Sequence, residues 1–240
     1  MFDVKRHPLN YYEANVRNIE ESEPLTEGKI IFYGSSGFTR WSERWCKEHG
    51  GTSVEKMILG KNGEQVILNH AFGGSTLEEQ LYYYPRLIRA YKPKALVFTG
   101  FANDFSFGYN PIEVMMLFSR LMEYARTDFP GIKIFITDKR PTAKFVPADP
   151  HVEYEERKWD KGAWMNVPDE MNNALRDYCK LHDDVTLVEY SKFPWLFQEG
   201  CVGNLRKVRE ELFVEDKVHF TEEAYKTLAE EWKKVLKDVL

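Results

Sequence analysis

Five short apolar runs recur along the chain, and each ends at glycine or polar residues. Most of these runs are continuously apolar rather than alternating, which is typical of strands buried on both faces of a sheet. Longer stretches with apolar residues at helical spacing lie between them. The predicted strands are Lys29–Tyr33, Gln65–Asn69, Ala95–Thr99, Ile132–Thr137 and Val185–Glu189.

Two of the intervening stretches carry clear helix signals. The segment 75–78 (Ser-Thr-Leu-Glu) has the pattern of a capping box that opens a helix, and Pro85 is expected to kink or interrupt that helix. The segment 110–113 (Asn-Pro-Ile-Glu) places a cap residue, a first-turn proline and an N3 glutamate in register. The helix that follows is predicted to end at Pro130-Gly131.

A last helix is predicted near the C-terminus, where Thr221 can act as the N-cap and Phe220 and Tyr225 occupy hydrophobic-staple positions. Alternation of strands and helices predicts an α/β fold, with a parallel sheet, right-handed crossovers and helices on both faces. No repeat, low-complexity tract or linker interrupts the chain. Residues 1–240 are therefore expected to form a single domain, with 1–28 as an N-terminal extension packed on it.

Composition excludes several classes of function. The chain has 240 residues, 43% of them hydrophobic and 30% charged, as in an ordinary soluble globular protein. Its net charge of −5 gives no electrostatic reason to expect nucleic acid or an anionic membrane as partner. No apolar run approaches the roughly 20 residues of a membrane span, and no N-terminal leader is visible.

The three cysteines, an odd number without CxxC spacing, argue against a disulfide framework or a structural zinc, and a cytoplasmic location is expected. A GxGxxG or P-loop pattern is absent as well, so no nucleotide cofactor is expected. A metal is not expected either, because no set of ligands is visible. The sequence carries no signal for an oligomeric state.

Residues suited to acyl transfer follow the first three predicted strands and precede the last predicted helix. In chain order they supply a serine hydroxyl, a glycine N–H, an asparagine amide, and a histidine with a carboxylate. Ester hydrolysis through an acyl-enzyme needs these groups. The segments are 34–37 (Gly-Ser-Ser-Gly), 72–75 (Phe-Gly-Gly-Ser), 102–104 (Ala-Asn-Asp) and 216–219 (Asp-Lys-Val-His).

Ser36 is the candidate nucleophile because it follows a predicted strand at a turn into a helix. Gly34 and Gly37 allow that turn to be tight, so that the hydroxyl is exposed and the Ser36 N–H points toward an oxyanion. The alternative interpretation is a helix-capping serine, a role for which Ser35 qualifies equally. No GxSxG pattern is present, which argues against the usual α/β-hydrolase elbow.

Two further segments offer oxyanion donors. The N–H of Gly74 lacks a neighbouring Cβ and can approach a substrate oxygen closely. The side-chain amide of Asn103 is a candidate third donor, while Asp104 is interpreted as a brace for its loop, because an anion aimed at an oxyanion would be harmful. Glycine and Asn-Asp are also ordinary turn residues, which is the alternative for both segments.

Asp216 and His219 have the most specific spacing. At three residues apart on one loop, the carboxylate can accept a hydrogen bond from Nδ1, which leaves Nε2 to take the serine proton. A solvated surface histidine is the alternative, and a metal site would need further ligands that the sequence does not supply. A histidine base predicts a rate that falls below a pH near ~6.5, shifted by Asp216.

Together these residues resemble the SGNH, or GDSL-type, hydrolases, which are named for a Ser, Gly, Asn and His in separate blocks. Block one corresponds to 32–36, block two to 69–75, block three to 102–104 and block five to 216–219. The resemblance runs from about Lys29 to the C-terminal helix.

The resemblance implies Ser36 as nucleophile, His219 as base and Asp216 as its orienting carboxylate. It also implies an oxyanion hole made by the Ser36 N–H, the Gly74 N–H and the Asn103 side chain. For the fold it implies a flavodoxin-like three-layer α/β/α sandwich, with a five-stranded parallel sheet in the order 2-1-3-4-5.

Two positions depart from the family pattern. Many members have Gly-Asp-Ser where this chain has Gly-Ser-Ser at 34–36, and Phe101 occupies the usual glycine position of block three. The ring of Phe101 is expected to narrow the pocket or shift the loop. A catalytically silent domain that binds a glycan is therefore an alternative to the enzyme.

The expected function is hydrolysis of short acyl esters, acetyl esters above all, on a carbohydrate or other small polar molecule. Phe101 and Phe105 are the predicted substrate-binding residues, because aromatic rings stack on sugar faces or enclose an acyl chain. The family also suggests a lysophospholipase or thioesterase as an alternative. The segment 139–164 is expected to form either a lid over the site or a surface excursion.

Overall fold

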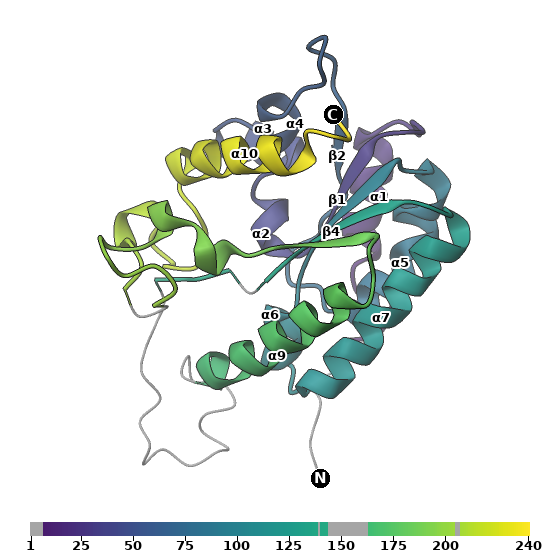
Figure 1. The fold of residues 1–240 in the computed structure, drawn as a ribbon. Helices are drawn as coiled ribbons and strands as arrows, with labels where there is room; N and C mark the ends of the chain where they lie inside the picture. Colours follow the sequence, from purple (N-terminus) through teal and green to yellow (C-terminus); the bar gives the residue numbers. More distant parts are fainter. Residues whose placement is uncertain (1–6, 139, 144–162, 205–206) are drawn as a thin grey trace.

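The computed structural model describes residues 7–138, 140–143, 163–204 and 207–240. Within these residues a five-stranded parallel sheet has the order β2-β1-β3-β4-β5, with helices on both faces (Figure 1). The predicted fold class and strand order are confirmed, and each strand lies within two residues of its predicted bounds. The strands are β1 (Ile30–Gly34), β2 (Ile67–Asn69), β3 (Ala95–Thr99), β4 (Lys133–Thr137) and β5 (Val185–Val188).

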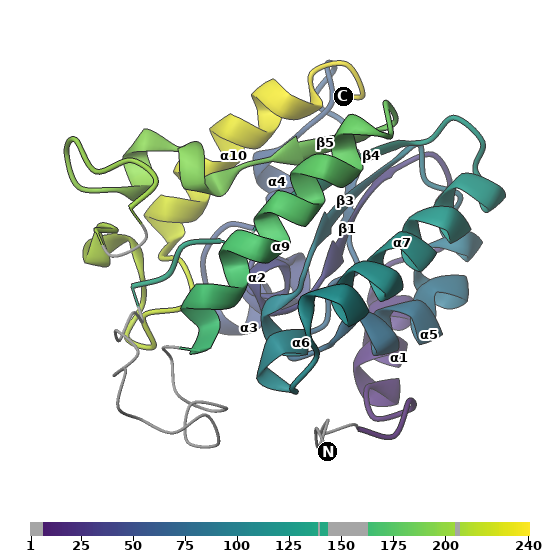
Figure 2. The ribbon, with the colours of Figure 1, turned by 60° about the horizontal axis from the view of Figure 1, so that its bottom comes forward.

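Two groups of helices enclose the sheet, as Figures 1 and 2 show. The first group consists of α1 (Glu13–Ser22), α5 (Leu77–Leu87), α6 (Ala102–Ser106), α7 (Pro111–Asp128) and α9 (Ala163–Lys180). The second consists of α2 (Ser36–Thr39), α3 (Glu43–His49), α4 (Val54–Met57) and α10 (Glu222–Leu236). Four short 3-10 turns complete the described elements: η1 (Arg89–Tyr91), η2 (Tyr190–Lys192), η3 (Pro194–Leu196) and η4 (Glu210–Leu212).

Alternate residues of β1 face the two layers. Ile31 and Tyr33 belong to the core cluster shared with α1, α5 and α7, whereas Ile30 and Phe32 belong to the cluster shared with α4 and α10. All five residues of β1 are buried. Because both faces of the strand are covered, its sequence is continuously apolar rather than alternating.

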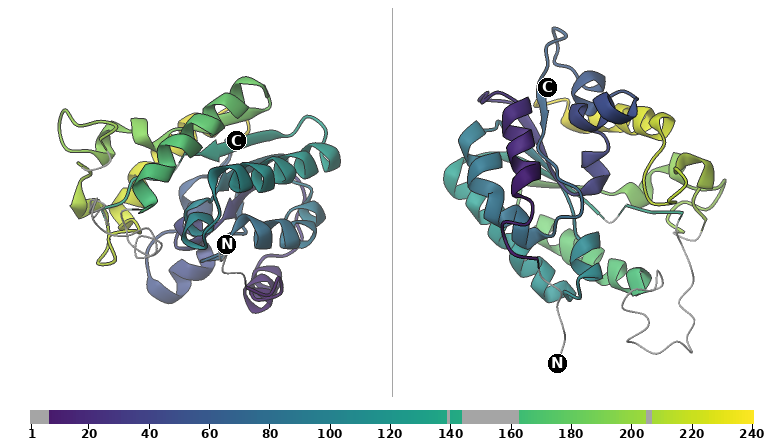
Figure 3. Two further views of the ribbon diagram at one scale, coloured as in Figure 1. Left: turned by 90° about the horizontal axis from the view of Figure 1, so that it is seen from below. Right: turned by 180° about the vertical axis from the view of Figure 1, so that it is seen from behind.

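The described part of the N-terminal extension packs on the first core. Val16 and Ile19 of α1 are buried in that cluster. Arg86 of α5 donates to Glu13 at 2.7 Å and to Glu20 at 2.6 Å, which ties α1 to the side of α5. Figure 3 shows these two helices next to each other in the view from behind.

Helix α5 begins one residue later than predicted. Its capping box pairs Thr76 with Glu79, whose Oε2 accepts the Thr76 N–H at 2.6 Å. Ser75, the predicted cap residue, instead donates its hydroxyl to the Phe72 carbonyl at 2.9 Å. Pro85 lies inside the helix, which ends two residues later and is followed by η1.

The other two predicted helix starts are confirmed. Oδ1 of Asn110 accepts the N–H groups of Ile112 and Glu113, and α7 ends before the Pro-Gly pair at 130–131. Thr221 accepts the Ala224 N–H at 3.3 Å at the start of α10. The adjoining rings of Phe220 and Tyr225 are 5.7 Å apart, as a hydrophobic staple requires.

The segment 139–164 lies outside the described residues, except for 140–143 and the first residues of α9. Whether it forms a lid therefore stays a prediction. Over the part of the chain that is described, no helix combines the length and the apolar character needed to cross a membrane.

Candidate active site

The segments singled out from the sequence meet at the carboxyl edge of the sheet. Ser36 begins α2 two residues after the last residue of β1, the Gly-Gly pair at 73–74 follows β2, and Asn103 follows β3. The loop 214–219 leads into α10. Because all five strands are parallel, the segments that follow them lie along one edge, where α/β proteins bind ligands.

Ser36 owes its position to a close approach of two strands. Gly34, the last residue of β1, has φ +151°, and a Cβ placed on it would lie 2.0 Å from the Thr99 carbonyl oxygen of β3. Only glycine fits there, and the chain turns sharply into α2. A Cβ placed on Gly73 would lie 3.7 Å from the Ser36 Cβ, so the turn after β2 packs against this serine.

The predicted oxyanion donors belong to two loops that are fastened together. Nδ2 of Asn103 donates one N–H to the Ser75 carbonyl at 2.9 Å, and Oδ1 of Asp104 accepts the Leu77 N–H at 2.9 Å. Asp104 is buried, and burial raises its pKa to about 7. Asp104 therefore braces the loop, as predicted. Gly74 lies in the same turn with φ +86°.

The loop before α10 holds its histidine through one carboxylate. Oδ1 of Asp216 accepts the N–H groups of Val218 and His219 at 2.8 and 2.9 Å, and Oδ2 lies 2.7 Å from Nδ1 of His219. Lys217 allows this tight turn by adopting φ +58°. An imidazole that donates Nδ1–H to a carboxylate presents Nε2 as the proton acceptor.

Among the described residues, Nε2 of His219 is buried and has no hydrogen-bond partner, so no hydrogen bond to Ser36 is present there. The loop and the serine turn are nevertheless tied to each other. Three side chains make these links: Arg40 pairs with Asp216 Oδ2 at 2.9 Å, Arg140 donates to the Val218 carbonyl at 2.6 Å, and Tyr225 donates to the Gly37 carbonyl at 3.0 Å. Hydrogen bonds between catalytic groups are often long without substrate and tighten when it binds.

The environment of His219 opposes its protonation. Burial and the charge of Arg140 lower its pKa to about 4, with a smaller contribution from Arg40 and against the influence of Asp216. This value is lower than the ~6.5 expected from the sequence. Burial alone would raise the pKa of Asp216, but the backbone N–H groups of His219 and Val218 hold it well below its usual range.

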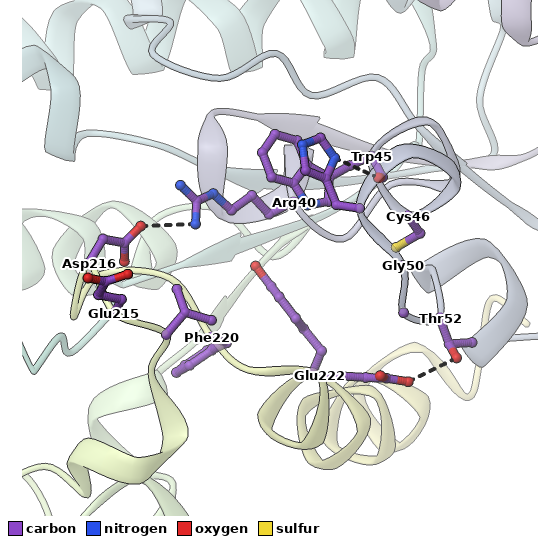
Figure 4. Close-up of a pocket in the computed structure, with 13 residues that line it drawn as sticks. Arg40, Trp45, Cys46, Gly50, Thr52, Glu215, Asp216, Phe220 and Glu222 are labelled. Atoms are coloured by element: carbon purple, nitrogen blue, oxygen red, sulfur yellow. Dashed lines mark hydrogen bonds and ion pairs between the residues drawn. The ribbon is translucent and has the colours of Figure 1, made fainter.

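A cavity of about 700 Å³ lies beside the Arg40–Asp216 pair (Figure 4). Residues from α3, the loop before α10 and α10 itself line it, among them Trp45, Phe220, Glu222 and Tyr225. Ser36 and His219 are not among the lining residues. The cavity therefore adjoins the candidate active site through Asp216, which lines it.

The structure does not support a substrate contact by Phe101. Its side chain is 1% exposed and packs in the core, with its ring 5.7 Å from that of Phe118. From the sequence, this ring was expected to narrow the pocket or shift the loop. The buried ring does not line the described cavity, and the backbone at Phe101 adopts φ +76°. Phe105 is partly buried against the same core cluster.

Sequence reasoning missed Arg40 and Arg140. Arg140 lies three residues after the end of β4, so its place after the fourth apolar run was a usable signal. For Arg40 the one sequence signal was its position about one helical turn after Ser36.

The model of the GDSL-like lipase/acylhydrolase family matches residues 25–232. A comparison with curated proteins found no match. Among solved structures, a GDSL-like lipase from Bacteroides thetaiotaomicron has a TM-score of 0.69 at 17% identity, covering 97% of this chain and 100% of that one.

Two other structures share the fold. A putative acylhydrolase from Bacteroides fragilis has a TM-score of 0.67 at 16% identity, covering 98% of this chain and 100% of that chain. A variant of an acetyl-xylooligosaccharide esterase from Geobacillus has a TM-score of 0.61 at 12% identity, covering 90% and 96%. With a family model that spans most of its length, this chain belongs to the GDSL-like lipase/acylhydrolase family.

Proposed function

We propose that this protein is a serine esterase in which Ser36 is the nucleophile, His219 the general base and Asp216 the residue that orients the base. Membership in an acylhydrolase family implies ester hydrolysis. The observation that carries the residue assignment is the 2.7 Å contact between Asp216 Oδ2 and His219 Nδ1, which leaves Nε2 without a partner among the described residues. That loop is tied to α2, the helix that begins at Ser36, by the pair between Arg40 and Asp216.

In this mechanism Nε2 of His219 takes the hydroxyl proton as Ser36 attacks the ester carbonyl. The N–H groups of Ser36 and Gly74 and the second N–H of the Asn103 amide stabilise the oxyanion. His219 then protonates the departing alcohol, which leaves an acyl group on Ser36. Water, activated by the same imidazole, hydrolyses that ester and restores the serine.

For the substrate we propose short acyl esters, acetyl above all, on a carbohydrate or other small polar molecule. The cavity beside Asp216 supports this choice, because its lining offers carboxylates and the Thr52 hydroxyl as well as aromatic rings. Aromatic rings can stack on sugar faces while a few polar groups fix the orientation of a small polar ligand. The structural similarity to an acetyl-xylooligosaccharide esterase agrees with it.

The test is hydrolysis of p-nitrophenyl acetate by Ser36→Ala, with Ser35→Ala as the matched control. Ser36→Ala should lower kcat by a factor on the order of 10⁶, whereas Ser35→Ala should retain most of the activity. A Ser36→Ala protein that hydrolyses the ester at the wild-type rate would refute the assignment. Comparing acetyl with octanoyl esters tests the substrate class, since a higher kcat/KM for octanoyl would contradict a short-acyl preference.

A further inference from the structure

We propose that Arg40 and Arg140 are positioning residues that hold the loop 214–219 against the Ser36 turn and place two guanidinium charges beside the imidazole of His219. The inference rests on the proposed function, since it assigns His219 the role of base. Neither arginine needs to touch the substrate in this role. Each acts on the base through contacts to the loop that carries it.

Arg40 acts through the carboxylate that orients the base. It is the C-cap residue of α2, which begins at Ser36, and its Nη1 lies 2.9 Å from Oδ2 of Asp216. This is the same oxygen that contacts Nδ1 of His219. Stacking of the guanidinium 5.2 Å from the Trp45 ring centroid restrains Arg40 from the opposite side (Figure 4). The position of Asp216 is therefore coupled to the helix that starts at Ser36.

Arg140 connects the two segments more directly. Its Nη2 donates to the Val218 carbonyl at 2.6 Å, and its guanidinium lies over the Phe220 ring, 4.6 Å from the centroid. These two residues flank His219 in the sequence. Nη1 of Arg140 would lie 3.4 Å from a Cβ on Gly37, the residue after Ser36. One guanidinium thus spans from the serine turn to both neighbours of the histidine.

Among the described residues, the charges that act on the pKa of His219 are those of Arg140, Arg40 and Asp216. Arg140 approaches from the segment after β4 and Arg40 from α2, while Asp216 is the carboxylate on the histidine's own loop. Tyr225 of α10 is buried beside the same arginines, and burial raises its pKa, which keeps it neutral. Other described titratable groups line the neighbouring cavity or belong to the loop, among them His49, Glu215, Lys217 and Glu222.

A protonated imidazole here would be a third cation facing one carboxylate. Burial and the two arginines together account for the lowered pKa of His219, about 4, which Asp216 by itself would raise. If the arginines have this role, removing either charge makes protonation easier while the Asp216–His219 contact persists. A purely structural arginine would affect stability without changing how His219 titrates.

The experiment compares Arg40→Gln and Arg140→Gln with wild type, using Arg89→Gln as the matched control. Arg89 also forms an arginine–carboxylate pair, with Asp128 at 2.8 Å, but it lies in η1 at the opposite edge of the sheet. Two properties are measured: the pH dependence of kcat/KM, and the titration of the His219 imidazole by NMR, assigned from its absence in His219→Ala.

Both glutamine variants should raise the midpoint of the kcat/KM profile and the midpoint of the His219 titration, Arg140→Gln by about one pH unit and Arg40→Gln by less, while Arg89→Gln leaves them unchanged. Arg140→Lys keeps the charge but cannot span from Gly37 to Val218. It should keep the acid midpoint near that of wild type and lower kcat about 10–100-fold with little change in KM. Where a glutamine variant does not fold, the kcat of the Arg140→Lys enzyme still tests the positioning role.

Unchanged His219 midpoints in the NMR titrations of Arg40→Gln and Arg140→Gln would overturn the inference, as would an Arg140→Lys enzyme with wild-type kcat. The NMR titration does not depend on turnover. Failure of the proposed function, seen as full activity of Ser36→Ala, is therefore distinguishable from failure of this inference.

Discussion

Burial and two nearby arginines affect the pKa of His219 more than Asp216, its nearest partner, does. The 2.7 Å contact with Asp216 favours the imidazolium, yet burial and two arginines lower the pKa to about 4. A general base works only while it is neutral. In the proposed role of His219 as general base, a pKa of about 4 keeps the imidazole neutral in mildly acidic solution.

The rate of ester hydrolysis should therefore fall only as the pH drops through about 4, and not near 6.5. The measurement is kcat/KM for p-nitrophenyl acetate over the range from about pH 3 to 8, with enzyme stability checked at each pH by return to neutral buffer. A reversible loss of rate centred near ~6.5 would show that His219 titrates like an exposed histidine.

Asn103 has one observed and one proposed role, and a single substitution removes both. Its amide donates to the Ser75 carbonyl and, in the proposed mechanism, also to the oxyanion. Asn103→Ala should lower kcat about 10²–10³-fold, because one preorganised donor is lost. Steady-state kinetics measures this effect.

Asn110→Ala is the matched control for Asn103→Ala, since Asn110 caps α7 outside the site. It should cost about 1 kcal/mol of stability and leave kcat unchanged. Equal effects of both substitutions on kcat would contradict an oxyanion role for Asn103.

At the residue scale, the sequence predicted contacts that are local and missed those that are long-range. Asp216 and His219 are three positions apart, so their contact follows from spacing in one loop. Arg140 and Val218 are 78 positions apart, and only the folded sheet brings them together. The buried position of the Phe101 ring was not predicted either. It occurs with a backbone φ of +76°, at a position where the family pattern has glycine.

At the scale of elements, the packing of β1 against β3 requires a glycine at the last position of β1, Gly34. The Thr99 carbonyl of β3 lies 2.0 Å from the place that a Cβ on Gly34 would occupy, and β1 and β3 are paired over their whole length. The backbone cannot move away without breaking this pairing. Gly34→Ala should therefore destabilise the protein by about 3 kcal/mol, measured as the free energy of unfolding in urea.

Gly100→Ala provides the comparison for this element. The nearest atom to its added Cβ, on Phe98, lies at 3.7 Å, which is ordinary contact, and Gly100 has no positive φ. Its effect should stay below about 1 kcal/mol. If Gly34→Ala were as mild as Gly100→Ala, the strand packing described around Ser36 would be incorrect.

Element types followed from the sequence more reliably than their ends. All five strands lie where continuous apolar runs predicted them, because burial on both faces leaves a strong pattern. The start of α5 was displaced by one residue because Thr76 and Glu79 form the capping box, while Ser75 donates its hydroxyl to the Phe72 carbonyl. Ser75 and Thr76 are both suitable cap residues with a glutamate three positions later, so the local pattern did not distinguish them.

For the whole molecule, buried carboxyl groups with raised pKa values contribute to the pH dependence of stability. Glu55 is 4% exposed, and burial, helped by the charge of Glu23, raises its pKa to about 7. The folded chain therefore keeps this proton between roughly pH 4.3 and 7, while the unfolded chain releases it. Its contribution to stability is complete below that window and is lost as the pH rises through 7.

Glu55→Gln removes this dependence. Relative to wild type, the variant should gain about 1–3 kcal/mol of unfolding free energy between about pH 5 and 8. Urea denaturation at both pH values measures the difference, and the titration of His219 cancels because both proteins contain it. Glu48→Gln, on the exposed side of α3, is the control. A difference that is independent of pH would show that Glu55 is ionised in the folded protein.

The proposed mechanism depends most on the nucleophilic character of Ser36 at the edge of the sheet. The most direct measurement is the reaction of the protein with a fluorophosphonate, followed by intact mass and peptide mapping. We expect one adduct, on the peptide that carries Ser36, present in Ser35→Ala and absent from Ser36→Ala. A protein that stays unlabelled, or a Ser36→Ala variant labelled as fast as wild type, would contradict the account.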